Sequence, residues 1–149
     1  GDNLEGNAGD DLINAGGGND FADGGNGDDE IHGGKGDDRL IGNDGRDDLY
    51  GGDGKDRLDG GHADDLLNGG AGKDTFVFTN GDDIDLFWDF KPGTDKIELR
   101  IDNVNSWDDL RQHIFRSGAD TVLDFAGGDQ IILRNVHAND LHSGDFLIL

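Results

Sequence analysis

A nine-residue repeat runs through the first half of the chain and limits the folds that are open to it. From Gly6 to Val77 the sequence divides into eight nonapeptides without insertion or deletion, preceded by part of another copy at residues 1–5. A strict period of this kind is typical of solenoids, in which each repeat packs only on its neighbours. We therefore predict a repeat architecture for this half of the chain.

Two positions of the repeat keep their chemical character throughout. The sixth position is aspartate in every copy, at Asp2, Asp11, Asp20, Asp29, Asp38, Asp47, Asp56, Asp65 and Asp74. The eighth is apolar in every copy, at Leu4, Ile13, Ala22, Ile31, Leu40, Leu49, Leu58, Leu67 and Phe76. Solubility alone would not hold so many carboxylates in one register, so these aspartates are candidate ligands.

Glycine or asparagine fills most of the first, second and fourth positions. Because these residues accept left-handed backbone torsions, we expect the first six residues of each copy to form a tight turn with carbonyl groups facing a common cavity. The last three residues would form a short strand with the apolar side chain inward. Two copies would complete one coil, which stacks Leu4, Ala22, Leu40, Leu58 and Phe76 in one sheet and Ile13, Ile31, Leu49 and Leu67 in the other.

Charge and composition indicate what such a coil needs. The 149 residues include 28 glycines, no cysteine, and 34 acidic against 12 basic side chains, for a net charge of −22. A chain this acidic is a poor partner for nucleic acid or an anionic membrane. One aliphatic side chain per nine residues is too little core to offset the backbone entropy lost on folding. We expect a divalent cation to supply the difference, and Ca²⁺ accepts carboxylate and carbonyl oxygens.

The pattern GGxGxDxUx, in which U is apolar, is clearest at residues 33–41 and 51–59. It resembles the calcium-binding nonapeptide of the RTX, or haemolysin-type, proteins. The resemblance implies an all-β fold, a right-handed parallel β-roll, in which each Ca²⁺ lies between copy n and copy n+2. It implies six internal sites, at the pairs Asp11 with Asp29, Asp20 with Asp38, Asp29 with Asp47, Asp38 with Asp56, Asp47 with Asp65, and Asp56 with Asp74. A partial site could form at Asp2.

The same resemblance places metal-site residues at positions two, four and six of the complete copies. At position two these are Asn7, Gly16, Gly25, Gly34, Asn43, Gly52, Gly61 and Gly70. At position four they are Gly9, Gly18, Gly27, Gly36, Gly45, Gly54 and Gly72. Ala63 replaces the fourth-position glycine and Ala15 a first-position one. If position four requires a positive φ, Ala63 is strained, and sites that use the turn at residues 60–65 are expected to be weaker.

Residues 78–149 change to ordinary β patterning, so we predict an RTX roll at residues 1–77 and a β-rich capping region at residues 78–149. Within residues 83–90, the alternation predicts a strand with Ile84, Leu86, Trp88 and Phe90 on its apolar side. Another strand is expected around residues 97–101, a short helix from a capping box at Ser106 to near residue 118, and strands at residues 121–125 and 130–136. Such a region would cover the open end of a solenoid.

Residues 89–99, DFKPGTDKIEL, are similar to the region that follows the repeats in serralysin-type proteases. The final GDFLIL resembles a C-terminal signal read by type I secretion systems, and a terminal strand of the cap is the alternative. These resemblances imply a secreted, extracellular protein, monomeric, whose partners are calcium, the secretion apparatus and an upstream domain of the same polypeptide. The roll would fold on calcium outside the cell and stabilise that domain.

Signatures of catalysis do not occur: the sequence holds no HExxH, GxSxG or P-loop. We therefore expect no enzymatic activity from this chain. Two other functions stay open. A polysaccharide-binding module would need exposed aromatic side chains or a basic groove, for which Tyr50 with Arg39, Arg46 and Arg57 is a slender basis, and Trp88 and Trp107 are expected in the core. A spacer segment of an adhesin is the other.

Overall fold

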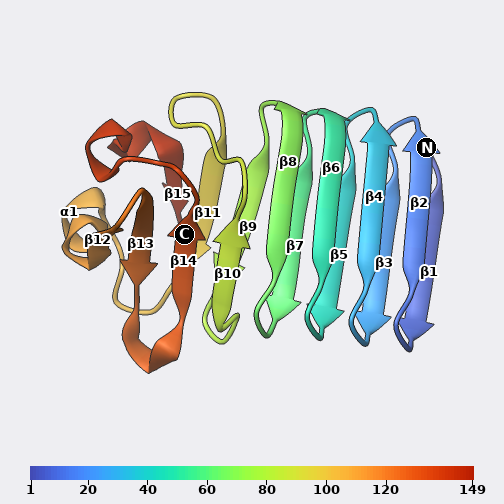
Figure 1. The fold of residues 1–149 in the computed structure, drawn as a ribbon, viewed down its shortest axis with the longest axis horizontal. Coiled ribbons are helices and arrows are strands. Elements are labelled where there is room, and N and C mark those ends of the chain that lie inside the picture. Colours follow the sequence, from blue (N-terminus) through green and yellow to red (C-terminus); the bar gives the residue numbers. More distant parts are fainter.

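The computed structural model covers residues 1–149 and consists of two facing β-sheets joined coil by coil along one axis (Figure 1). Strands of odd number from β1 to β11 lie in one sheet, which ends on β15. Strands of even number from β2 to β10 lie in the other, which continues through β14, β13 and β12. The repeats form a parallel β-solenoid, as predicted, whereas β13 pairs antiparallel with β12 and with β14.

Within the roll the strands are of similar length. The first sheet holds β1 (Asn3–Ala8), β3 (Phe21–Asn26), β5 (Arg39–Asp44), β7 (Arg57–His62), β9 (Thr75–Thr79), β11 (Lys96–Arg100) and β15 (Phe146–Ile148). The second holds β2 (Leu12–Gly17), β4 (Glu30–Lys35), β6 (Asp48–Gly54), β8 (Leu66–Gly72), β10 (Ile84–Phe87), β14 (Gln130–Leu133), β13 (Asp120–Asp124) and β12 (Ile114–Ser117).

The register follows the repeat, because each residue pairs with the one two copies later. Leu4 lies opposite Ala22, and Ala22 opposite Leu40. On the other sheet Ile13 lies opposite Ile31. The two predicted apolar stacks are therefore confirmed, and Leu40, Leu49 and the later members are fully buried. Past the repeats the stacks continue, with Ile97 opposite Phe76 and Phe87 opposite Leu67.

The strands are longer than predicted. A strand such as β3 contains the last three residues of one copy and the first three of the next, because parallel hydrogen bonds continue through the glycines of positions one and two. Only positions four to six, for example residues 27–29, form the tight turn. Gly25 within β3 has φ of 108°, so the strand changes direction there while its pairing persists.

The predicted phase of the strand at residues 83–90 is wrong within β10, although Phe90, beyond the end of that strand, is buried as predicted. Asp85 and Phe87 of β10 face the interior and are fully buried, whereas Ile84 and Trp88 are 39% and 40% exposed. Strand β10 is the next rung of the roll, so Phe87 occupies the apolar position over Leu67. Neighbouring strands therefore set which face is buried, and the apolar alternation within the segment does not.

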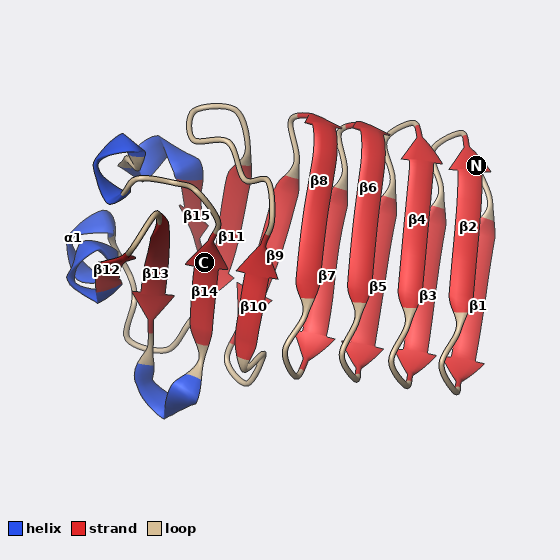
Figure 2. Ribbon diagram, viewed as in Figure 1, coloured by secondary structure: helices blue, strands red, loops and turns tan.

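Helical segments gather at one end of the molecule (Figure 2). Helix α1 (Trp107–Leu110) begins at the predicted cap, where the Ser106 hydroxyl accepts a hydrogen bond from the backbone N–H of Asp109. A 3₁₀ turn at Arg111–His113 follows it. The helix does not reach residue 118 as predicted, because Ile114 begins β12 and pairs with Leu123.

Further 3₁₀ turns lie at Ala126–Gly128, Ala138–Asp140 and Ser143–Asp145. None of the helices combines the length and the apolar character needed to span a membrane. The strands expected around residues 121–125 and 130–136 are present as β13 and β14. The last residues form β15, which pairs with β11, Ile97 lying opposite Phe146.

Outer-face aromatic side chains stack on their neighbours. Trp88 was expected in the core, but it lies on the outer face with the Arg134 guanidinium 3.4 Å from its ring centroid. Tyr50 stacks on His32 at 4.8 Å between ring centroids. Trp107 is half-buried and packs against Phe146. Each of these rings thus contacts another side chain, while Phe115 of β12 is 53% exposed.

Candidate metal centres

The sixth-position aspartates lie in the turns between the two sheets and point inward. Each turn places its aspartate directly before a strand, as Asp38 precedes β5 and Asp47 precedes β6. From Asp20 to Asp74 every one of them is at most 3% exposed. Buried carboxylates are rare unless they are paired or bound to a metal, so these residues require a partner.

A ladder of hydrogen bonds joins the aspartates of successive coils. The backbone N–H of Asp20 donates to Oδ1 of Asp38 at 2.8 Å, and that of Asp38 donates to Oδ1 of Asp56 at 2.9 Å. The same bond links Asp29 to Asp47 on the opposite edge of the roll. All six aspartate pairs predicted from the repeat are joined in this way, so the structure brings them together as the sequence implied.

The second carboxylate oxygen has no hydrogen-bond partner. In nine aspartates Oδ2 is buried and unpaired, namely Asp11, Asp20, Asp29, Asp38, Asp47, Asp56, Asp65, Asp74 and Asp85. An unpaired buried polar atom costs about 1 to 3 kcal/mol, and more when it is charged. A row of such atoms with one common orientation indicates sites built to bind a cation.

The first-position glycines leave room for oxygen atoms around that carboxylate. A Cβ atom placed on Gly33 would lie 2.5 Å from Oδ2 of Asp38 and 2.6 Å from the carbonyl oxygen of Gly51 in the next coil. Gly51 has the same relation to Oδ2 of Asp56 and the carbonyl of Gly69. Carboxylate and carbonyl oxygens thus face one space, which is the donor set of a hard cation such as Ca²⁺. The sequence analysis did not include these first-position glycines.

The glycines of positions two and four have a different role in the structure. Their φ angles are positive, and Cβ atoms on Gly34 and Gly36 would overlap the carbonyl oxygens of Gly16 and Gly18 in the preceding coil. They therefore permit successive coils to approach closely. Whether their own carbonyls bind an ion stays a prediction.

No three histidine, aspartate or glutamate side chains converge as a metal-binding group. An ion in the ladder would therefore depend on pairs of carboxylates together with backbone carbonyls. This is the composition expected of a flexible calcium site, because Ca²⁺ takes six to eight oxygen ligands.

Burial strongly affects the ionisation of the ladder. Loss of solvent raises the pKa of Asp47 and of Asp56 to about 6, and that of Asp65 to about 8. The donating backbone N–H opposes the rise, and the carboxylate in the adjacent coil adds to it. The ion-free roll therefore concentrates negative charge where it is least stable.

Two aspartates beyond the repeats extend the ladder, and the sequence analysis missed both. The N–H of Asp65 donates to Oδ1 of Asp85, and that of Asp74 to Oδ1 of Asp95, each at 3.1 Å. They were missed because their spacing is 20 and 21 residues, whereas it is 18 within the repeats. The short pattern of an aspartate two residues before a buried apolar residue, Asp85 before Phe87, could have found them.

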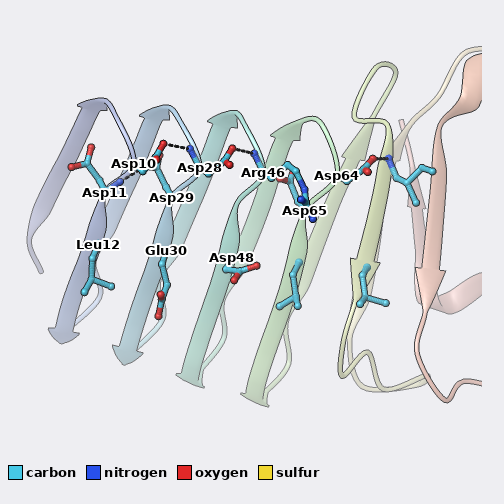
Figure 3. A pocket seen from close by; sticks show the side chains of 13 residues that line it. Asp10, Asp11, Leu12, Asp28, Asp29, Glu30, Arg46, Asp48, Asp64 and Asp65 are labelled. Atoms are coloured by element: carbon cyan, nitrogen blue, oxygen red, sulfur yellow. Dashed lines mark hydrogen bonds between the residues drawn. The ribbon is translucent and has the colours of Figure 1, made fainter.

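A second row of hydrogen bonds runs along one edge of the roll, outside the ladder (Figure 3). The backbone N–H of Asp28 donates to Oδ1 of Asp10, and the N–H of Arg46 donates to Oδ1 of Asp28. Further along, the N–H of Ile84 donates to Oδ1 of Asp64. These side chains help to line an open groove of about 590 Å³. Because the carboxylates of Asp10, Asp28 and Asp64 are exposed and already accept a backbone hydrogen bond, we assign no ion to them, although the ladder aspartates Asp11, Asp29 and Asp65 line the same groove.

Ala63 carries the strain that its position predicted, with φ of 85° where the other repeats have glycine. Ala63→Gly is expected to stabilise the calcium-loaded chain by about 1 kcal/mol, because it removes the left-handed penalty of a side chain. Urea unfolding followed by circular dichroism would measure this gain.

Ala15→Gly is the matched control for Ala63→Gly, since Ala15 does not have a positive φ. It is expected to lower stability by about 0.5 to 1 kcal/mol through the added freedom of the unfolded chain. Equal effects of the two substitutions would contradict the strain at Ala63.

The parallel solenoid and its ladder of buried aspartates define a class of calcium-binding repeat proteins. The sequence profile described as the RTX calcium-binding nonapeptide repeat (4 copies) matches residues 1–31, 23–58 and 50–85. The chain belongs to this family, and its repeats form a calcium-binding β-roll.

Solved structures give the fold neighbours. The extracellular lipase LipA from Serratia marcescens superposes with a TM-score of 0.64 at 18% identity, over 99% of this chain and 38% of the lipase chain. This chain therefore spans well under half of that protein. The AlgE6R3 subunit of the Azotobacter vinelandii mannuronan C5-epimerase is also similar, with a TM-score of 0.46 at 25% identity, covering 95% of this chain and 79% of that chain. No curated protein sequence matches the chain.

Proposed function

We propose that this chain is a module that folds when it binds several Ca²⁺ ions outside the cell. The observation that carries the proposal is the row of buried Oδ2 atoms without a hydrogen-bond partner. Each of the six aspartate pairs would hold one ion together with carbonyl oxygens of the glycine turns. Binding energy of this kind becomes folding energy, because the site does not exist in the unfolded chain.

The charge of the chain supports ion-coupled folding. Without a cation, the buried carboxylates must either repel one another or take up protons. Calcium removes this penalty and stabilises the folded state by mass action, more strongly the further its concentration exceeds the dissociation constant. Cytosolic calcium is kept far below the extracellular level, so the chain would stay unfolded inside the cell and fold after export.

We further propose a place for the module in a larger secreted protein. Residues 1–77 would be the ion-binding roll, and residues 78–149 a serralysin-like cap at the C-terminal end that nucleates it. The folded roll would stabilise an upstream effector domain. The extracellular lipase with a similar fold is consistent with export, and the family supports calcium as the trigger. The terminal GDFLIL, part of which forms β15, would serve type I secretion.

A calcium titration followed by far-ultraviolet circular dichroism tests the proposal. The chain, stripped of calcium, is expected to lack the β signal and to gain it cooperatively on addition of Ca²⁺, whereas Mg²⁺ should fail. Magnesium demands near-ideal octahedral geometry and releases its water reluctantly, and the turns offer a flexible set of oxygens.

The double variant Asp38→Ala with Asp56→Ala serves as the control in this titration. It removes two adjacent members of one edge of the ladder, so its transition should move to much higher calcium or disappear. A wild-type chain that keeps its full β signal without calcium would show that the apolar stacks suffice and would refute ion-coupled folding.

A further inference from the structure

Two segments beyond the nonapeptides repeat the aspartate-to-apolar spacing of the roll. Asp85 precedes Phe87, which lies opposite Leu67, and Asp95 precedes Ile97, which lies opposite Phe76. Each aspartate thus occupies the same place in its coil as a sixth-position aspartate. They lie on opposite edges of the roll, one at the end of each hydrogen-bond ladder.

Asp85 shares its burial and the state of both carboxylate oxygens with the ladder aspartates of the repeats. Its side chain is fully buried, and its Oδ1 accepts the N–H of Asp65. Its Oδ2 is buried and has no partner, as is Oδ2 of Asp65. In the following coil the register places Ile131 opposite Asp85, so no later carboxylate continues this edge.

Asp95 differs from Asp85 in one atom contact. Its Oδ1 accepts the N–H of Asp74, but its Oδ2 accepts the N–H of Lys91 at 2.8 Å. Both oxygens are therefore satisfied by backbone donors, and the turn at residues 91–95 closes this edge of the ladder without an ion. The two edges of the roll thus end on the same residue type in different states of hydrogen bonding.

Other acidic side chains near Asp85 already have partners. Asp82 accepts from both the backbone N–H and the hydroxyl of Thr79. Asp64 accepts the N–H of Ile84. On this edge the last two unpaired carboxylate oxygens are those of Asp65 and Asp85, and they belong to two successive coils.

We propose that Asp65 and Asp85 bind a further Ca²⁺ ion, outside the nonapeptide pairs, and that Asp95 binds none. This inference rests on the proposed function, because it extends the calcium ladder by one coil into the capping region. The ion would fasten β10 to the roll through the aspartate of each coil. The hydrogen-bonded Asp95 would do the same on the opposite edge without metal.

The test counts calcium bound per chain at saturation, by equilibrium dialysis and metal analysis of the whole chain. Asp85→Asn is expected to lose about one ion relative to wild type. Asp74→Asn, which removes the last repeat aspartate of the other edge, should also lose about one. Asp95→Asn should lose none, because Asp95 binds no ion, although the amide oxygen can replace only one of the two carboxylate acceptors.

A wild-type ion count for Asp85→Asn would overturn the inference while leaving the repeat sites intact. A wild-type chain that binds no calcium would instead overturn the proposed function, so the two failures are distinct. If Asp85→Asn does not fold, Asp85→Glu keeps the carboxylate and moves it. That variant should retain the wild-type ion count with one weakened site, and unchanged affinity at every site would contradict a role of Asp85 as a ligand.

Discussion

Gly36→Ala is expected to destabilise the β-roll strongly even in saturating calcium, whereas Gly9→Ala should destabilise it much less. The two glycines have the same position in the repeat and similar φ angles of 122° and 114°. A Cβ on Gly36 would overlap the carbonyl oxygen of Gly18 in the preceding coil, and a Cβ on Gly9 would meet nothing within 4 Å. A comparison of the two variants therefore distinguishes the cost of a positive φ from the cost of a side chain between adjacent coils.

The expected sizes of the two effects differ clearly. Gly9→Ala carries only the left-handed penalty of about 1 to 2 kcal/mol. Gly36→Ala must also shift its turn away from the carbonyl of Gly18, as the turn at Ala63 adjusts to its side chain with φ of 85°, so a loss of about 2 to 5 kcal/mol is expected. Urea unfolding in calcium, followed by circular dichroism, gives both values. Equal losses of stability would mean that the coils accommodate the added side chain, and that glycine is needed at position four only for its positive φ.

Calcium-free protein is expected to regain β structure when it is acidified from about pH 8 to about pH 5. Burial raises the pKa of Asp47, Asp56, Asp65 and Asp85, the last to about 10. The folded state therefore binds protons more tightly than the unfolded state. Its ion-free stability is fully present below the ordinary aspartate pKa and is lost as pH rises through the values near 6 and 8.

Circular dichroism of protein stripped of calcium on a chelating resin would measure this acid-induced folding. Soluble chelators are unsuitable, because they lose calcium affinity when protonated. With calcium present the pH dependence should be opposite, because calcium affinity rises toward higher pH as protons stop competing for the carboxylates. A β signal of the ion-free chain that falls on acidification would contradict the buried, ion-free carboxylates.

The roll was predictable because the aspartates and the apolar residues recur with the same nine-residue period. A strict spacing of nine predicted the apolar stacks, and the resemblance to the RTX nonapeptide implied the aspartate pairs of the ladder. The capping region was less predictable, since insertions of two and three residues shift Asp85 and Asp95 out of that spacing. The alternation within residues 83–90 predicted the wrong buried face for β10. Asp85 is buried because it belongs to the ladder, and Ile84 and Trp88 therefore lie on the outer face.

The ion-ligand geometry depended on backbone positions that composition does not reveal. Gly33 and the other first-position glycines border the unpaired oxygens, and only the folded register brings the carbonyl of Gly51 beside Asp38. The positive φ at position four was predictable, because every other complete repeat has glycine where Ala63 stands. Helix length was not, since Ile114 joins a strand whose partner, Leu123, lies nine residues further on.

The ladder has a polarity, because every amide donor belongs to the earlier coil and every carboxylate acceptor to the later one. A newly forming coil on the N-terminal side meets an acceptor already in place, as Asp2 does at Asp20. On the C-terminal side, a coil would have to bring the acceptor itself. The two ends of the ladder are therefore chemically different, since the first coil presents the carboxylate acceptor of Asp2 and the last coil presents none beyond Asp85.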